Sequence, residues 1–132
     1  MSEPLQVLYV EDEPDIRAVV ELALEYEGFG LVACASGRAA LDQAPGLKPD
    51  LILLDVMMPD MDGPTTLRQL RELPHLADTP VIFMTAKVQA NEVAQYKAMG
   101  ALGVINKPFN PMALADEIRN ILRRGHDRPA HD

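Results

Sequence analysis

Four consecutive apolar residues, LILL at positions 51–54, run directly into Asp55. A short apolar run without polar alternation is typical of a strand covered on both faces, because a half-exposed strand would carry polar residues at alternate positions. Four further runs of β-favouring residues lie at 5–10, 31–35, 80–85 and 103–105. Together with 51–56, they predict five strands of a parallel sheet.

Helical spacing of apolar residues fills the intervals between the predicted strands. Pro14, Pro64 and Pro111 suit the first turn of a helix, where a missing N–H costs nothing. Ser36 and Asn110 suit the N-cap position. We expect helices that begin near residues 14, 36, 64, 91 and 111.

Five strand–helix units predict an α/β fold, an open, doubly wound, five-stranded parallel sheet with five helices. A chain of 132 residues is too short for an eight-unit barrel and suits one ordinary domain. The segment RGHDRPAHD at 124–132 is polar and has no apolar stripe. We therefore expect one domain over residues 1–124, followed by a polar C-terminal tail at 125–132.

Charged and hydroxyl residues stand at the carboxyl ends of the predicted strands, where open α/β sheets bind their ligands. Glu11 and Asp12 follow the first strand and Asp55 ends the third. Thr85 ends the fourth strand, and Lys107 follows the fifth. All five side chains are expected to converge on one rim of the sheet.

Three carboxylates on one rim would repel one another strongly, and Lys107 supplies a single compensating charge. An all-oxygen set without His or Cys favours Mg²⁺ over Zn²⁺ as the remaining cation. Mg²⁺ sites of this kind combine one or two carboxylates with phosphate oxygens. The set therefore suits delivery of a phosphoryl group to Asp55, with Thr85 and Lys107 each binding a phosphoryl oxygen.

Each of these residues also has an ordinary structural interpretation. Asp12 or Glu13 could cap the first helix, where acids are favoured. Thr85 could simply end a strand, and Lys107 could be a solvated surface group. Asp55 is harder to explain in this way, because a buried acid needs a partner.

The amino-acid composition limits the kinds of partner that the protein can bind and the cellular compartment in which it is expected. The formal net charge of -8 argues against a general nucleic-acid or membrane surface. Cys34 is the only cysteine, which excludes an intrachain disulfide, and it is expected in the core. No stretch approaches the roughly 20 apolar residues of a membrane span, and no signal peptide is visible, so we expect a cytoplasmic protein without membrane insertion.

Four motifs together resemble the response-regulator receiver domain of the CheY-like superfamily over residues 5–123: VEDEP (10–14), LLDVMMPDMDG (53–63), MTA (84–86) and KPF (107–109). The resemblance implies a flavodoxin-like sheet with strand order 2-1-3-4-5. It also implies a phosphorelay module of a two-component system. Such a module accepts a phosphoryl group from a histidine kinase or phosphotransfer protein and switches its contacts with a downstream protein.

The resemblance assigns a role to each matching residue. Asp55 becomes the phosphoacceptor, and Asp55, Glu11 and Asp12 become Mg²⁺ ligands, with the backbone carbonyl of Met57 as a further ligand. Thr85 and Lys107 contact the phosphoryl group. The Lys107–Pro108 peptide bond is expected to be cis. Asp60 and Asp62 are expected to be turn residues that lead to Gly63.

One departure from the family pattern concerns the switch. Many receivers carry an aromatic residue three positions before the lysine, whereas this chain has Val104 there. We expect Val104 to keep its exposure on phosphorylation. Leu102 and Gly103 stand where DNA-binding regulators commonly carry acids, so a single-domain receiver without direct nucleic-acid contact is favoured, with a segment cut from a longer chain as the alternative.

Three other functions fit the sequence less well than a phosphorylated receiver. A haloacid-dehalogenase-type (HAD-like) phosphatase needs an acid two residues after its nucleophile, where this chain has Met57. A flavodoxin needs phosphate donors after the first strand, where EDEP would repel a phosphate. A phosphorylation-independent binding module would not need the five site residues. We therefore expect no enzyme activity beyond self-phosphorylation and slow autodephosphorylation. Met57 and Lys87 are expected to influence the rate of autodephosphorylation.

Overall fold

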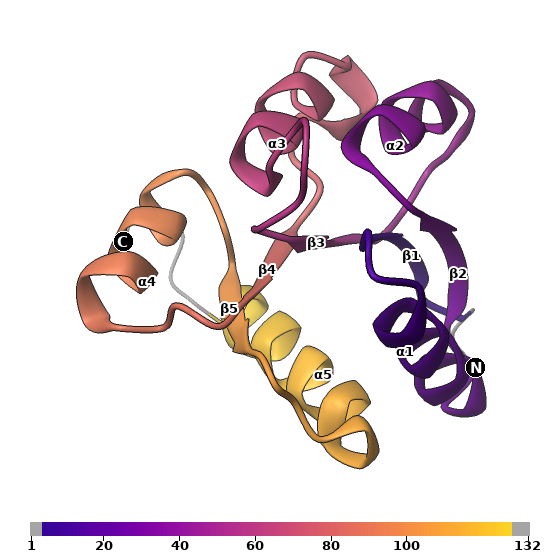
Figure 1. Ribbon diagram of the computed structural model, residues 1–132, viewed down its shortest axis with the longest axis vertical. Helices are drawn as coiled ribbons and strands as arrows, with labels where there is room; N and C mark the ends of the chain where they lie inside the picture. The colour runs from indigo at the N-terminus through magenta and orange to yellow at the C-terminus, as the bar shows by residue number, and fades with distance from the viewer. Residues whose placement is uncertain (1–3, 128–132) are drawn as a thin grey trace.

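Five parallel strands form one sheet at the centre of the computed structural model, which describes residues 4–127. The strands are β1 (Gln6–Val10), β2 (Gly30–Cys34), β3 (Leu51–Asp55), β4 (Val81–Thr85) and β5 (Gly103–Asn106). They lie in the order β2-β1-β3-β4-β5 (Figure 1). The predicted α/β fold and its strand order are confirmed.

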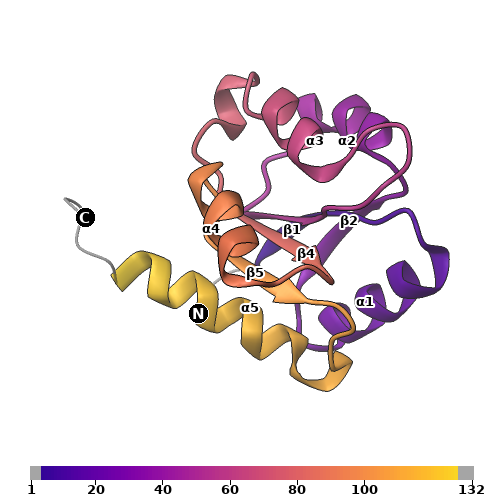
Figure 2. The same cartoon turned by 60° about the vertical axis from the view of Figure 1, so that its left-hand side comes forward.

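Helices cover both faces of the sheet. They are α1 (Pro14–Tyr26), α2 (Gly37–Gln43), α3 (Gly63–Leu70), α4 (Ala90–Ala98) and α5 (Pro111–Asp127), with short 3-10 helices η1 (Ala44–Gly46) and η2 (Pro74–Leu76). Figure 2 shows α2 and α3 on one side of the sheet and α1 and α5 on the other. Within residues 4–127, none of these helices is both long enough and apolar enough to cross a lipid bilayer.

The last helix extends past the boundary that the sequence suggests. We expected a polar tail from residue 125, whereas α5 continues through Asp127. Helical hydrogen bonding can extend into a polar end, because a helix needs apolar residues only on its packed face. Residues 128–132 of the expected tail lie outside the described part of the chain.

Side-chain caps start three of the helices. Ser36 Oγ accepts a hydrogen bond from the Ala39 N–H at 3.0 Å, as predicted for an N-cap. Asn110 Oδ1 accepts one from the Met112 N–H at 3.0 Å. Asp62, which we expected to be a turn residue, is the N-cap of α3 and accepts a hydrogen bond from Thr65.

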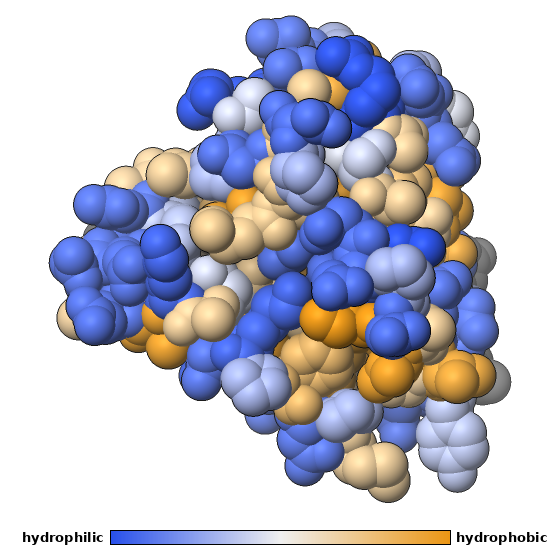
Figure 3. Space-filling view, viewed as in Figure 1, coloured by the Kyte–Doolittle hydropathy of each residue, from blue (hydrophilic) through white to orange (hydrophobic). Residues whose placement is uncertain are grey.

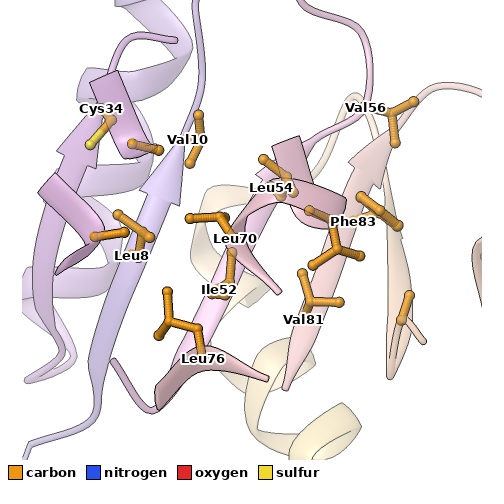
Figure 4. Packing of buried hydrophobic residues seen from close by; sticks show 14 of the residues in the cluster. Leu8, Val10, Cys34, Ile52, Leu54, Val56, Leu70, Leu76, Val81 and Phe83 are labelled. Atoms are coloured by element: carbon orange, nitrogen blue, oxygen red, sulfur yellow. The ribbon is translucent and has the colours of Figure 1, made fainter. Parts of the chain in front are cut away.

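The core consists of two apolar clusters separated by the sheet. One faces α2 and α3 and includes Leu8, Val10, Cys34, Ile52, Leu54, Val81 and Phe83 (Figure 4). The other faces α1 and α5 and includes Val7, Tyr9, Leu51, Leu53, Ile82 and Met84. Every residue of β3 is buried, because this strand contributes alternate side chains to both clusters. Cys34 lies in the core as expected.

Leu53→Ala tests how strongly the fold depends on β3. Leu53 is fully buried, and its truncation leaves a cavity, so the free energy of unfolding should fall by about 2–5 kcal/mol. Leu22→Ala is the matched control, since Leu22 is 71% exposed and its truncation should cost less than about 0.5 kcal/mol. Urea unfolding measures both. Equal losses in the two variants would contradict the central position of β3.

Candidate functional site

The polar residues of the site continue apolar rows on one face of the sheet. Tyr9 in β1 and Leu53 in β3 are neighbours in register, and both pack in the cluster that faces α1 and α5. Because strand side chains alternate, Glu11 and Asp55, two positions later, point to the same side at the carboxyl edge. Lys107 reaches this point from the end of β5.

Lys107 joins the two buried acids. Its Nζ lies 3.1 Å from Glu11 Oε1 and 3.2 Å from Asp55 Oδ1. Glu11 is fully buried and Asp55 is 2% exposed. Buried charges require partners, and one ammonium group cannot neutralise two carboxylates. The site therefore keeps an excess of negative charge.

A third carboxylate adds to this excess. Glu11, Asp12 and Asp55 each place a carboxylate oxygen within 4.8 Å of the others. This spacing allows one small cation to contact all three, directly or through water. An oxygen-only ligand set with surplus negative charge suits Mg²⁺, so the residues present fit that ion.

Burial and neighbouring charges shift the pKa values of Asp55 and Lys107. The pKa of the Asp55 carboxyl is raised to about 7, first by burial and then by the negative charge of Glu11, while Lys107 acts in the opposite direction. Burial alone would lower the pKa of Lys107, but its hydrogen bond to Glu11 and the charge of Asp55 raise it above the ordinary value. Lys107 therefore stays charged, while the ionised form of Asp55 is disfavoured.

Thr85 ends β4, the strand next to β3, and is 1% exposed. Its Oγ1 accepts a hydrogen bond from the backbone N–H of Lys87 at 3.1 Å. In the described part of the chain, this hydroxyl therefore bonds to the loop after β4 and not to the carboxylates of Glu11, Asp12 or Asp55. Thr85 lies on the expected rim, where it ties that loop to the strand end.

The loop after β3 folds back tightly against the end of its own strand. The Gly63 N–H donates to the Val56 carbonyl at 2.9 Å, and a Cβ on Gly63 would lie 2.5 Å from the Asp55 carbonyl oxygen. Only glycine permits this close approach. Asp60, with φ 70°, makes the turn as expected. Met57 lies in this loop, beside Asp55, with its side chain 61% exposed.

Two further observations concern residues named from the sequence. Glu13 occupies the N-cap position of α1, but its side chain makes no capping hydrogen bond. Its backbone N–H donates to Glu11 Oε2 at 3.3 Å, so the interpretation of Glu13 as a side-chain cap does not hold. The Lys107–Pro108 peptide bond is cis.

Sequence reasoning missed two residues that hold Glu11. The Tyr9 hydroxyl donates to Glu11 Oε1 at 3.4 Å, and Arg17 donates to the Glu11 backbone carbonyl at 2.9 Å. Burial raises the pKa of Tyr9 well above its ordinary value, and the charge of Glu11 raises it further, so the hydroxyl keeps its proton. The sequence pattern that could have predicted the contact is the position of Tyr9, two residues before Glu11 and therefore on the same face of the strand.

Comparison with known proteins identifies the family of the chain. The family model described as "Response regulator receiver domain" matches residues 7–119. The transcriptional regulatory protein CseB of Streptomyces avermitilis is 38% identical over 138 residues, covering 100% of this chain and 57% of that protein. The DNA-binding response regulator MtrA of Mycolicibacterium smegmatis is 36% identical, covering 95% of this chain and 54% of that protein. The chain thus spans about half the length of the curated relatives it matches.

Solved structures give the same result for the fold. The chemotaxis response regulator CheY4 of Vibrio cholerae superposes with a TM-score of 0.84 at 32% identity, covering 89% of this chain and 98% of that chain. A putative response regulator from Chloroflexus aurantiacus superposes with a TM-score of 0.82 at 31% identity, covering 92% and 100%.

Asp55→Asn should stabilise the fold in Mg²⁺-free buffer at pH 8. Because the folded-state pKa of Asp55 is raised from 3.8 to about 7, its contribution to stability is greatest below pH 4 and is lost as pH rises through 7. An amide cannot ionise, so the variant avoids that loss and gains on the order of 2 kcal/mol in free energy of unfolding.

Denaturant unfolding from pH 4 to pH 8 measures this difference between wild type and Asp55→Asn. Saturating Mg²⁺ is the control, because a bound cation offsets the excess charge and should reduce the advantage of the variant. A constant difference across the pH range would contradict the raised pKa of Asp55.

Proposed function

The chain belongs to the response regulator receiver domain family of two-component systems, and on this premise we propose that Asp55 is its phosphoacceptor. The observation that carries the proposal is the convergence of Glu11, Asp12 and Asp55 on one point, with Lys107 bridging two of them. The phosphodonor would be a phosphohistidine of a histidine kinase or phosphotransfer protein. The output would be a changed contact with a downstream protein.

The transfer itself needs one nucleophile and charge neutralisation. An Asp55 carboxylate oxygen attacks the phosphorus and forms a P–O bond. The P–N bond of the phosphohistidine breaks, and its electron pair leaves with the imidazole nitrogen, which takes up a proton. In the step that resets the switch, water attacks the phosphorus and loses a proton, the P–O bond to Asp55 breaks, and its electron pair stays on the Asp55 carboxylate, which releases inorganic phosphate.

Mg²⁺ fits this site, and the residues that would hold it are Asp55, Glu11 and Asp12, with the backbone carbonyl of Met57. The ion would supply neutralisation of charge on the carboxylates and on the transferring phosphoryl group. The surplus negative charge supports this proposal, because Lys107 alone leaves it uncompensated.

Lys107 and Thr85 would bind the phosphoryl oxygens. Lys107 already contacts Asp55 and needs only a small displacement to follow the oxygen that carries the new group. Thr85 would donate its hydroxyl proton to a phosphoryl oxygen, and a turn of the side chain toward that oxygen would break its hydrogen bond from the Lys87 N–H and release the loop after β4. Met57 and Lys87, both exposed, would flank the path of the attacking water.

Phosphoryl chemistry on other substrates is not part of the proposal. An HAD-like phosphatase would need a general acid two residues after Asp55, and Met57 cannot supply a proton. We propose that the chain catalyses only its own phosphorylation and its slow loss. We also propose a cytoplasmic protein whose receiver domain includes α5 through Asp127 and which contacts proteins in place of nucleic acid.

The surface of α1 supports a protein as phosphodonor. Hydrophobic surface gathers over α1, in the lower right of the view in Figure 3. Leu22 and Tyr26 of this helix are 71% and 89% exposed, and Val19 is 42% exposed. Exposed apolar clusters of this kind suit protein contacts. Since α1 begins at Pro14, directly after the acids, a protein that binds there would have access to Asp55.

Acetyl phosphate tests the phosphoacceptor assignment without a partner protein. In the presence of Mg²⁺ the wild-type chain should gain one phosphoryl group, detected by intact mass. Asp55→Asn should gain none, because an amide is not a competent nucleophile. Asp42→Asn is the matched control, since Asp42 is an exposed acid of α2, and it should be phosphorylated like wild type. A gain that survives Asp55→Asn would refute the assignment.

Phosphorylation should leave the exposure of Val104 unchanged. This side chain is half-buried, packs against the cluster that faces α2 and α3, and has neither a ring nor a hydroxyl to exchange between partners. Methyl NMR with a soluble relaxation agent compares the free protein with the form treated with acetyl phosphate. A large gain or loss of relaxation at the Val104 methyl groups would contradict this expectation.

A further inference from the structure

Tyr9 places a polar group inside an otherwise apolar cluster. Its side chain is fully buried, on the face of the sheet covered by α1 and α5. A buried phenol hydroxyl needs a hydrogen-bond partner, because desolvation without one is costly. The partner is Glu11 Oε1 at 3.4 Å. Tyr9 therefore contacts the site from the core side.

Glu11 is held by three donors of different kinds. Oε1 accepts from the Tyr9 hydroxyl and from Lys107 Nζ, at 3.4 Å and 3.1 Å. Oε2 accepts from the Glu13 backbone N–H at 3.3 Å. Of the two donors to Oε1, Lys107 is also bonded to Asp55, so its contact with Glu11 is shared.

The two donors to Oε1 differ in their freedom to move. Lys107 has a long side chain that reaches in from the rim and is 17% exposed. The Tyr9 ring is enclosed, and its backbone is paired on both sides, with Ala33 in β2 and Leu53 in β3. When Lys107 turns toward a phosphoryl oxygen, Tyr9 is the donor to Oε1 that stays in place.

We infer that Tyr9 is a positioning residue whose hydroxyl orients Glu11 for Mg²⁺ and keeps Oε1 hydrogen-bonded when Lys107 leaves it. This inference rests on the proposed function of the site. It extends that function from the rim into β1, to a residue that touches neither the ion nor the phosphoryl group. Outer partners of this kind fix the direction in which a ligand oxygen points.

Tyr9→Phe isolates the hydroxyl, because it keeps the ring that fills the cluster and removes only the donor. Tyr26→Phe is the matched control, since Tyr26 is 89% exposed. Two quantities are measured for each protein: the Kd for Mg²⁺ by calorimetry without a phosphodonor, and the initial rate of phosphorylation by acetyl phosphate at saturating Mg²⁺.

Tyr9→Phe should raise the Kd for Mg²⁺ roughly 3–10-fold, because Glu11 loses one orienting donor. Its rate at saturating Mg²⁺ should fall as well, since Oε1 has no remaining side-chain donor once Lys107 turns toward the phosphoryl group. Tyr26→Phe should change neither quantity. A Tyr9→Phe variant that melts at a lower temperature but binds Mg²⁺ like wild type would overturn the inference, because Tyr9 would then serve only the core.

A second measurement covers the case in which Tyr9→Phe does not fold. In wild-type protein with ¹³C-labelled tyrosine, the Tyr9 ring signals should shift on addition of Mg²⁺ and again on phosphorylation, whereas those of Tyr26 should not. Unchanged Tyr9 signals would overturn the inference. Failure of acetyl phosphate to modify wild type, with Mg²⁺ binding still weakened by Tyr9→Phe, would instead refute the proposed function and leave the positioning role standing.

Discussion

The ammonium group of Lys107 lies between the buried carboxylates of Glu11 and Asp55. The chemistry of the site depends on the excess of negative charge that results. One positive charge holds two negative groups that are almost free of solvent, with Asp12 close by. Burial, together with the negative charge of Glu11, raises the pKa of Asp55 to about 7, although Lys107 acts in the opposite direction. The excess of negative charge also suits a divalent cation. A site balanced by protein charges alone would have less need of Mg²⁺, so the excess charge is part of the function that we propose.

The fold provides the rigid frame that this imbalance needs. β3 is buried along its whole length between two apolar clusters, so Asp55 emerges from the most constrained strand of the sheet. Glu11 is held by Tyr9 from the core and by Arg17 through its backbone carbonyl. The groups that would respond to a phosphoryl group are more loosely held: Lys107 is on a long side chain, and Thr85 is bonded to an exposed loop. The rigidly held acids, Glu11 and Asp55, and the more mobile groups that would contact the phosphoryl group, Lys107 and Thr85, therefore lie on different parts of the same rim.

Much of this arrangement could be predicted from the sequence, because it follows from periodicity and topology. The apolar run before Asp55 predicts a buried central strand, and the rule that parallel strands share their carboxyl edge brings Glu11, Asp55 and Lys107 together. The details that escaped prediction depend on local hydrogen bonding. Asp62 is equally compatible with a turn or an N-cap. The sequence offers two end signals for the last helix, Gly125 and Pro129, and α5 continues past the first of them to Asp127. The hydrogen bond of Tyr9 depends on side-chain orientation, which strand alternation suggests but does not determine.

A crystal structure of the chain with Mg²⁺ and beryllium fluoride, an analogue of the phosphoryl group, tests the charge imbalance most directly. The expected result is one ion held by Glu11, Asp12, Asp55 and the Met57 carbonyl, directly or through water, with Lys107 Nζ in contact with a fluoride and no longer bridging Glu11 and Asp55. Glu11 should then keep its hydrogen bond from Tyr9. A structure in which Lys107 still bridges the two acids, with neither ion nor fluoride at Asp55, would contradict the role that we assign to this site.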